Sequence, residues 1–177
     1  MKQGGLQVSS VNIRKVTLED AEGILKHSKV VFGEGRNLLT TVEEFTLTIE
    51  EEEQWIEKQK RANNFVLVAE VHNEIVGMLN ATRSTRKRVQ HLCQFGISIQ
   101  EAYCNKGIGS QLITKLIEWA KQDEVIEKIC LEVFASNERA IYVYEKYGFV
   151  IEGMKKKHIK FEDGTYADEY NMGLFVK

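Results

Sequence analysis

The chain has 177 residues, of which 43% are hydrophobic and 28% are charged, and its formal net charge is −2. This length suits one globular domain with a sizeable core. The balanced charge argues against a dedicated nucleic-acid binder, which carries a basic excess, and no apolar run approaches the ~20 residues of a membrane-spanning helix.

The N-terminal segment is polar, contains Gly4-Gly5 and lacks the apolar stretch of a secretion signal. We therefore expect a flexible arm at residues 1–10 and a single domain at residues 11–177 that works in the cytoplasm. The chain has three cysteines without Cys-x-x-Cys spacing and four scattered histidines. This pattern indicates reduced thiols, and it predicts neither a disulfide framework nor a metal site.

The first half of the domain is predicted to contain a strand, two helices and a hairpin. Alternating apolar and polar residues favour a strand at 11–16. Thr17 and Asp20 have the spacing of a capping box, which predicts a helix to about Val31 before a loop with Gly33 and Gly35. A second helix is expected at about 41–62, with a break near Thr48. Two β-rich runs at 65–71 and 74–81, joined at His72-Asn73, predict a hairpin.

The second half alternates strands with helices and ends in another hairpin. We expect a strand at 90–99, a helix after Gly107, a strand at 128–134, a helix at 137–147 ended by Gly148, and two strands around a turn at 162–164. The order β-α-α-β-β-β-α-β-α-β-β predicts a mixed sheet with helices on its faces.

The turn before the third helix reads Asn105-Lys106-Gly107-Ile108-Gly109-Ser110. The first N–H groups of a helix have no intrahelical partner and carry the positive end of the helix dipole, so they attract anions. Glycine lets the backbone approach phosphate oxygens, although the same pattern occurs in a simple tight turn. The dinucleotide fingerprint is excluded because its third glycine position holds Leu112, and the P-loop because Lys106 precedes Gly107.

A second segment, residues 137–149, indicates which kind of phosphate ligand the loop binds. Together the two segments resemble the GNAT family of acetyl-CoA-dependent N-acetyltransferases, whose pattern is Arg/Gln-x-x-Gly-x-Gly/Ala followed later by Asn-x-x-Ala-x-x-x-Tyr-x-x-x-Gly-Phe. The matching residues are Asn137, Ala140, Tyr144, Gly148 and Phe149. The element order agrees over nearly the whole chain. The resemblance implies a single-domain α/β (α+β) fold, with a mixed, mostly antiparallel sheet of about seven strands flanked by about four helices.

The resemblance also implies that acetyl-CoA binds as co-substrate where strand 90–99 parts from strand 128–134. The backbone of Ile97 and Ile99 is expected to pair with the pantetheine amides, and the N–H near Ile97 to polarise the acetyl carbonyl. Tyr144 is expected to be the general acid that protonates the thiolate. The implied cofactor-binding residues are Ile97, Ser98, Ile99, Cys104, Asn105, Lys106, Gly107, Ile108, Gly109, Ser110, Asn137 and Tyr144.

One position departs from the family pattern, because Cys104 stands where the family has Arg or Gln. The loss of a long polar side chain implies one missing phosphate contact and a weakened affinity for CoA. A catalytic thiol at Cys104 is the alternative to a tolerated small residue.

The sequence does not identify the general base or the acceptor site. The family often supplies a carboxylate from strand 90–99, but this strand has none. The predicted substrate-binding residues are Glu44, His91 and Gln94. The candidates for the base are His91, Glu34, Glu43, Glu44, Asp168 and Glu169, and a chain of waters is the alternative.

The sequence thus predicts an N-acetyltransferase that uses direct transfer in a ternary complex. Its acceptor is a small-molecule primary amine or the N-terminal amine of a peptide or protein. Residues 157–174 resemble the bacterial branch near the ribosomal-protein and polyamine acetyltransferases, and a homodimer is expected, with no nucleic-acid or membrane partner. Two alternatives remain, a catalytically idle acyl-CoA-binding module of the same fold and an unrelated nucleotide-phosphate-binding protein.

Overall fold

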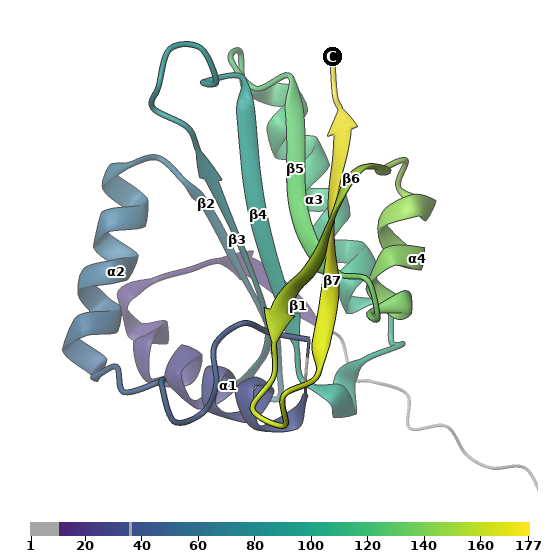
Figure 1. Ribbon diagram of the computed structural model, residues 1–177. Helices are drawn as coiled ribbons and strands as arrows, with labels where there is room; N and C mark the ends of the chain where they lie inside the picture. The colour runs from purple at the N-terminus through teal and green to yellow at the C-terminus, as the bar shows by residue number, and fades with distance from the viewer. Residues whose placement is uncertain (1–10, 36) are drawn as a thin grey trace, which may run out of the picture.

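The computed structural model describes residues 11–35 and 37–177, and over these residues it forms one seven-stranded sheet with four α-helices (Figure 1). The predicted fold class and element order are confirmed, and the expected arm at residues 1–10 lies outside the described residues. The elements are β1 Asn12–Lys15, η1 Leu18–Asp20, α1 Ala21–Glu34, α2 Ile49–Arg61, β2 Phe65–Val71, β3 Glu74–Arg83, β4 Leu92–Ile99, η2 Glu101–Tyr103, α3 Ile108–Gln122, β5 Lys128–Phe134, α4 Glu138–Lys146, β6 Val150–Lys160 and β7 Tyr166–Phe175.

The sheet has the order β1-β2-β3-β4-β5-β7-β6, and only the pair β4–β5 is parallel. This pair is short, since it ends at Gln94 opposite Cys130. Beyond that point β4 stays paired with β3 as far as Ile99, while β5 stays paired with β7 as far as Phe134. The two strands therefore part over their C-terminal halves, which confirms the predicted opening.

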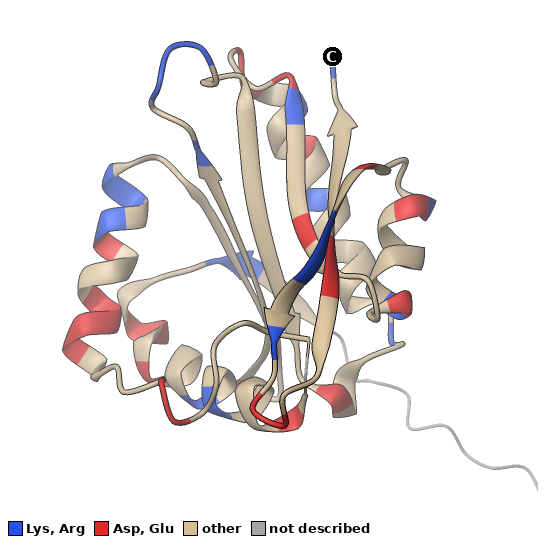
Figure 2. Cartoon of the chain, viewed as in Figure 1, with Lys and Arg blue, Asp and Glu red and all other residues tan. Residues whose placement is uncertain are grey.

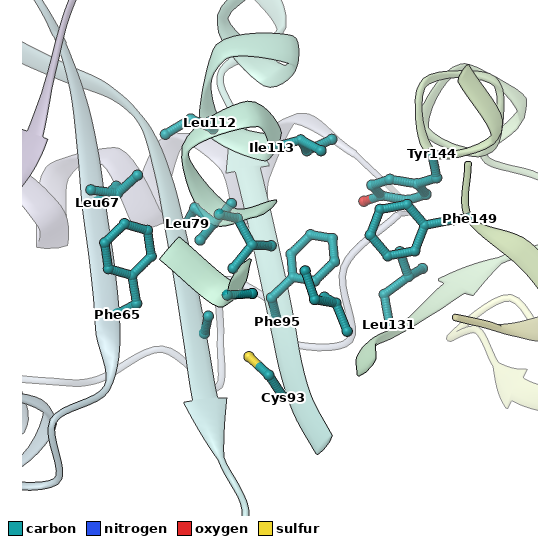
Figure 3. Packing of buried hydrophobic residues seen from close by; sticks show 14 of the residues in the cluster. Phe65, Leu67, Leu79, Cys93, Phe95, Leu112, Ile113, Leu131, Tyr144 and Phe149 are labelled. Carbon is teal, nitrogen blue, oxygen red and sulfur yellow. The ribbon is translucent and has the colours of Figure 1, made fainter. Parts of the chain in front are cut away.

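Helices cover both faces of the sheet, and the alternation of side chains along β2 distinguishes the faces. Phe65 and Leu67 belong to a core cluster with residues of α3 and α4, whereas Val66 and Val68 pack with residues of α1 and α2. Figure 3 shows the larger cluster, in which Phe95 of β4 lies between the side chains of α3 and those near α4. No helix among the described residues combines the length and apolarity that a bilayer crossing needs.

The second helix starts later than predicted. Thr48 caps α2, because its hydroxyl accepts a hydrogen bond from Glu51 N at 3.2 Å and the Glu51 carboxylate binds back. Thr41 makes a similar pair with Glu44, but no helix follows. Residues 42–46 include β-branched and aromatic residues, whereas Glu, Gln and Lys fill α2. Helix propensity therefore favours a helix after the Thr48–Glu51 capping box and not after the Thr41–Glu44 pair. The predicted start of the helix at Thr41 is wrong. The helix begins at Ile49, next to Thr48, where a break was predicted.

The end of the first helix and the start of β4 also differ from prediction. The helix α1 continues through Gly33 to Glu34, so only Gly35 marks its end. The strand β4 begins at Leu92 rather than at residue 90. The predicted hairpin is confirmed, and His72 and Asn73 have φ of 52° and 64°, as a type I′ turn requires.

The charges of α2 have a structural explanation. Figure 2 shows acidic residues toward the N-terminal end of α2 and basic residues toward its C-terminal end. This arrangement complements the helix dipole. The first turn also provides Glu52, whose side chain is buried and whose pKa is raised by that burial.

Candidate active site

A cavity of about 360 Å³ lies where β4 and β5 part. Its walls come from the end of α1 and the residues after it, from β4, from the loop into α3, and from α4. We call it the central cleft. Every predicted cofactor-binding residue except Lys106 lines the central cleft, and the ammonium of Lys106 lies 5.1 Å from the centre of the Tyr103 ring.

The start of α3 presents free backbone N–H groups to the central cleft. Gly107 is the N-cap residue with φ of +82°, a left-handed conformation that glycine adopts without strain. The first intrahelical hydrogen bond of α3 runs from Gln111 N to Gly107 O at 3.1 Å. The N–H groups of residues 108–110 therefore have no acceptor within the helix, and no acidic residue occupies the first turn. This is the geometry of an anion site.

The peptide groups of β4 alternate between β3 and the opening. Gln100 N donates to Val76 O of β3 at 3.0 Å, and Leu92 O accepts from Ser84 N on the same side. Because successive peptide groups of a strand point in opposite directions, those of Ile97 and Ile99 face the opening. The ladder to β5 has ended by then, so the N–H groups of Ile97 and Ile99 and the carbonyl of Ile97 are available to an extended ligand, while Ile99 O accepts from the Cys104 thiol.

Tyr144 projects from α4 toward the other side chains of the core cluster (Figure 3). The same residue also lines the central cleft. Its ring lies 5.9 Å from Phe95 in a T-shaped contact and 5.9 Å from Phe149. Burial raises the pKa of the phenol, which keeps its proton at neutral pH. Because Tyr144 lines the central cleft, its protonated hydroxyl is placed to donate to a ligand there.

Asn137 and Cys104 also line the central cleft. Asn137 caps α4, because its Oδ1 accepts from Ala140 N at 3.2 Å. The Cys104 thiol is half-buried with its Sγ 3.8 Å from Ile99 O, and burial raises its pKa. A raised pKa disfavours the thiolate, so the geometry argues against a nucleophilic role for Cys104.

An ion pair that the sequence did not indicate spans the edge of the central cleft. The Arg139 guanidinium binds both carboxylate oxygens of Glu101 at 2.8 and 2.6 Å and so connects α4 to η2. Glu101 N donates to Glu34 Oε2 at 2.8 Å, which adds the end of α1. Arg139 occupies a variable position of the family pattern, and no local signal distinguishes it.

The structure does not bring the three predicted substrate-binding residues to the central cleft. His91 lies before β4, where its carbonyl accepts from the N–H groups of Glu127 and Lys128, at the end of β4 that is paired with β5. Gln94 lies at the last pair before the opening, and Glu44 binds Thr41. Of the carboxylates considered as a base, only Glu34 lines the central cleft. Over the described residues no group of His, Cys, Asp and Glu side chains could hold a metal ion.

Comparison with known proteins identifies the family. Residues 34–149 match the model of the Acetyltransferase (GNAT) family. The match covers more than half of the chain, and the chain therefore belongs to this family.

Curated relatives and solved structures agree with this assignment. The L-amino acid N-acetyltransferase AaaT of Escherichia coli (strain K12) is 39% identical over 106 residues, which are 60% of this chain and 65% of AaaT. The chain thus spans about two thirds of that relative. The GNAT acetyltransferase from Streptococcus pneumoniae is 33% identical with a TM-score of 0.89, over 94% of this chain and 99% of that one. Two further Escherichia coli relatives at 28% identity, the ribosomal protein uS5-alanine and spermidine N-acetyltransferases, confirm the predicted likeness to that branch.

Acetyl-CoA is the co-substrate of this family. A protein of the same fold, yncA from Salmonella typhimurium, was solved with acetyl-CoA; it is 18% identical with a TM-score of 0.83 over 96% of this chain and 95% of that one.

Proposed function

We propose that this chain transfers the acetyl group of acetyl-CoA to a primary amine by direct attack in a ternary complex. The observation that carries the proposal is the central cleft itself. It combines the free N–H groups at the start of α3, the peptide groups of Ile97 and Ile99, and the Tyr144 hydroxyl. These are an anion site, a strand edge and a proton donor, which suit a diphosphate, a pantetheine arm and a departing thiolate respectively.

The reaction follows from these positions. The amine attacks the thioester carbon, and Ile97 N–H stabilises the developing oxyanion. The C–S bond then breaks, the electron pair goes to sulfur, and Tyr144 gives its proton to the thiolate. The ammonium formed by the attack loses a proton to water, and Tyr144 recovers one from the same solvent. The products are an N-substituted acetamide and CoA with a free thiol.

The acceptor is proposed to be a small-molecule amine or an N-terminal amine. The relatives support this class, because their names give L-amino acids, an alanine of ribosomal protein uS5 and spermidine as the acceptors, and all of these carry amines. Glu34 provides a negative charge at the wall of the central cleft formed by α1, which attracts a protonated amine before it is deprotonated.

An amine panel tests the proposal. The purified chain is incubated with acetyl-CoA and L-amino acids, peptides or polyamines, and free CoA thiol is measured. We expect turnover with at least one amine and competition by CoA that exceeds that by ATP or NAD. Tight CoA binding without turnover on any amine would favour the second candidate, an idle acyl-CoA-binding module. This candidate is kept because Cys104 stands where the family pattern has Arg or Gln. Preference for ATP or NAD would contradict both.

We also propose a cytoplasmic location and a homodimer. The three cysteines are free thiols, as a reducing compartment allows.

The strand β6 is at an edge of the sheet and exposes Val150, Ile151 and Met154, which supports a contact between copies. Light scattering on the purified protein measures the oligomeric state.

A further inference from the structure

A buried histidine of α1 contacts the central cleft through a serine of β4. His27 is 1% exposed, and its Nε2 lies 2.9 Å from Ser98 Oγ. Its Nδ1 lies 3.4 Å from Gln100 Nε2, and the same Gln100 nitrogen lies 3.2 Å from Ile75 O. Ser98 lines the central cleft.

This chain of contacts fixes the direction of each hydrogen bond. Ile75 O is a backbone carbonyl and can only accept, so the Gln100 amide must turn its NH₂ toward it. The second hydrogen of that NH₂ points to His27 Nδ1, which must therefore be the unprotonated ring nitrogen. The proton of the neutral ring is then on Nε2, and it is donated to Ser98 Oγ.

Ser98 is thereby prepared as a donor. Its oxygen accepts from His27, and its own hydrogen has no other partner in the part of the chain that the structure describes. The hydrogen bond from His27 occupies one lone pair of the Ser98 oxygen and fixes the position of the hydroxyl. The hydroxyl hydrogen is then free to be donated to a ligand oxygen.

The side chain of Ser98 lies on the opposite face of β4 from the proposed thioester pocket. Ile99 packs toward α3, since its Cδ1 lies 3.3 Å from where a Cβ on Gly109 would stand, and Ile97 packs on the same cluster. Ser98 alternates to the α1 face, where Val31 and Glu34 form the wall of the central cleft. The proposed cofactor site uses α3 and α4, so the α1 side is left to the acceptor.

We propose that Ser98 is a specificity-determining residue that donates a hydrogen bond to a carbonyl or carboxylate oxygen beside the acceptor amine, and that His27 is its positioning residue. The inference rests on the proposed acetyltransferase function and names a substrate class within it. That class is amines with an oxygen on the neighbouring carbon, as in α-amino acids and peptide N-termini, in preference to plain alkylamines.

Steady-state kinetics test the role of Ser98. The best α-amino acid or peptide acceptor of the panel is compared with its amide and with the amine that lacks the carboxyl or carbonyl group, for example L-phenylalanine, L-phenylalaninamide and phenethylamine. In Ser98→Ala, kcat/KM for the oxygen-bearing acceptors should fall about ten- to hundredfold further than for phenethylamine, which is the range of a lost hydrogen bond to a carbonyl or a carboxylate. A larger loss with the acid than with the amide identifies the carboxylate, and equal losses identify the carbonyl.

The role of His27 is tested through Ser98. His27→Phe should reduce the same selectivity ratio in the wild-type background and have less than about a twofold effect on it in the Ser98→Ala background. His27→Gln retains an N–H near the Nε2 position and should restore most of the ratio. Thermal unfolding of each variant serves as the control, because a merely structural role would lower stability and leave the ratio unchanged.

Two results would overturn the inference while the acetyltransferase proposal stands. One is that the best acceptors carry no oxygen beside the amine, as spermidine does not. The other is that Ser98→Ala raises the KM for acetyl-CoA and leaves the selectivity between acceptors unchanged. Absence of turnover with every amine would instead count against the acetyltransferase proposal itself.

Discussion

At the scale of single residues, Tyr144 is the side chain whose surroundings match its proposed role most directly. Its ring packs against Phe95 and Phe149, and the residue lines the central cleft. Tyr144→Phe keeps the ring contacts and removes the proton donor. We expect kcat to fall about ten- to a thousandfold, as for a lost proton transfer, while the Kd for CoA measured by calorimetry stays within about twofold.

The stability of this variant provides its control. Tyr144→Phe keeps the ring contacts with Phe95 and Phe149, so its melting temperature should stay close to that of the wild type. An unchanged kcat would remove Tyr144 from the acid role, and a large loss of CoA affinity would make it a binding residue instead.

His27 gives the stability of the fold a pH dependence. Burial lowers the pKa of this imidazole from 6.5 to about 4, because the protonated ring would be desolvated and would place a second N–H against Gln100. Between these two pKa values the unfolded chain binds the proton and the folded chain does not. The stabilising contribution is therefore present above pH 6.5 and is lost as the pH falls toward 4.

The expected size of this effect is about 2 kcal/mol between pH 7 and pH 5. Urea unfolding at the two pH values measures it, with His27→Gln as the matched variant that shares every other titrating group. The wild type should lose about 2 kcal/mol more than His27→Gln. Equal losses would show that His27 is free to protonate in the folded chain.

At the scale of elements, the start of α3 is the part of the site that a single charge should disable. Gly109 lies in the first turn and lines the central cleft, and a Cβ there would meet only Ile99 Cδ1 at 3.3 Å, the flexible end of a side chain. Gly109→Asp adds a carboxylate where the proposed diphosphate binds, while Gly109→Asn adds the same shape without charge.

We expect CoA to bind at least about tenfold more weakly to Gly109→Asp than to Gly109→Asn, because two like charges in contact near a protein surface repel by a few kcal/mol before screening. The Asp variant should not be less stable than the Asn variant, since a carboxylate favours a helix N-terminus. Calorimetry with CoA and thermal unfolding measure the two quantities. Equal affinities would place the diphosphate elsewhere.

The elements also show what the sequence could and could not predict. The loop at 104–110 and the segment at 137–149 identified both ends of the central cleft, because backbone conformation and helix capping are local properties. The start of α2 was misplaced because Thr41 and Thr48 carry the same capping signal, and only the residues that follow distinguish them.

The acceptor side was poorly predicted for a different reason. His91 is a candidate because the strand is predicted to begin at residue 90, but β4 begins at Leu92 and His91 precedes it, next to the end that pairs with β5. The contacts of Arg139 with Glu101 and of His27 with Ser98 join residues 38 and 71 positions apart. Such pairs depend on the packing of α1 against β4 and of α4 against η2, and they leave no periodic pattern in the sequence.

At the scale of the whole molecule, the sheet consists of two halves, β1–β4 and β5–β7–β6, that share only three parallel residue pairs. The core cluster with α3 and α4 spans both halves on one face. On the opening side, peptide groups of β4 are left without strand partners. A ligand that fills the opening therefore completes the hydrogen bonding of the sheet and connects its halves.

This architecture predicts a specific response to acetyl-CoA. At a hundred times its Kd, the ligand should stabilise the fold by about 2.7 kcal/mol and raise the melting temperature by roughly 5–10 °C. Without ligand, hydrogen exchange along β4 should alternate, slow at Ser98 and Gln100, whose N–H groups face β3, and fast at Ile97 and Ile99. Acetyl-CoA should slow exchange at Ile97 and Ile99, whereas ATP, which has phosphates but no pantetheine, should slow it only at residues 108–110. If acetyl-CoA slowed hydrogen exchange at residues 108–110 alone, the pantetheine arm would not pair with β4. The proposed role of Ile97 N–H in stabilising the oxyanion would then also be contradicted.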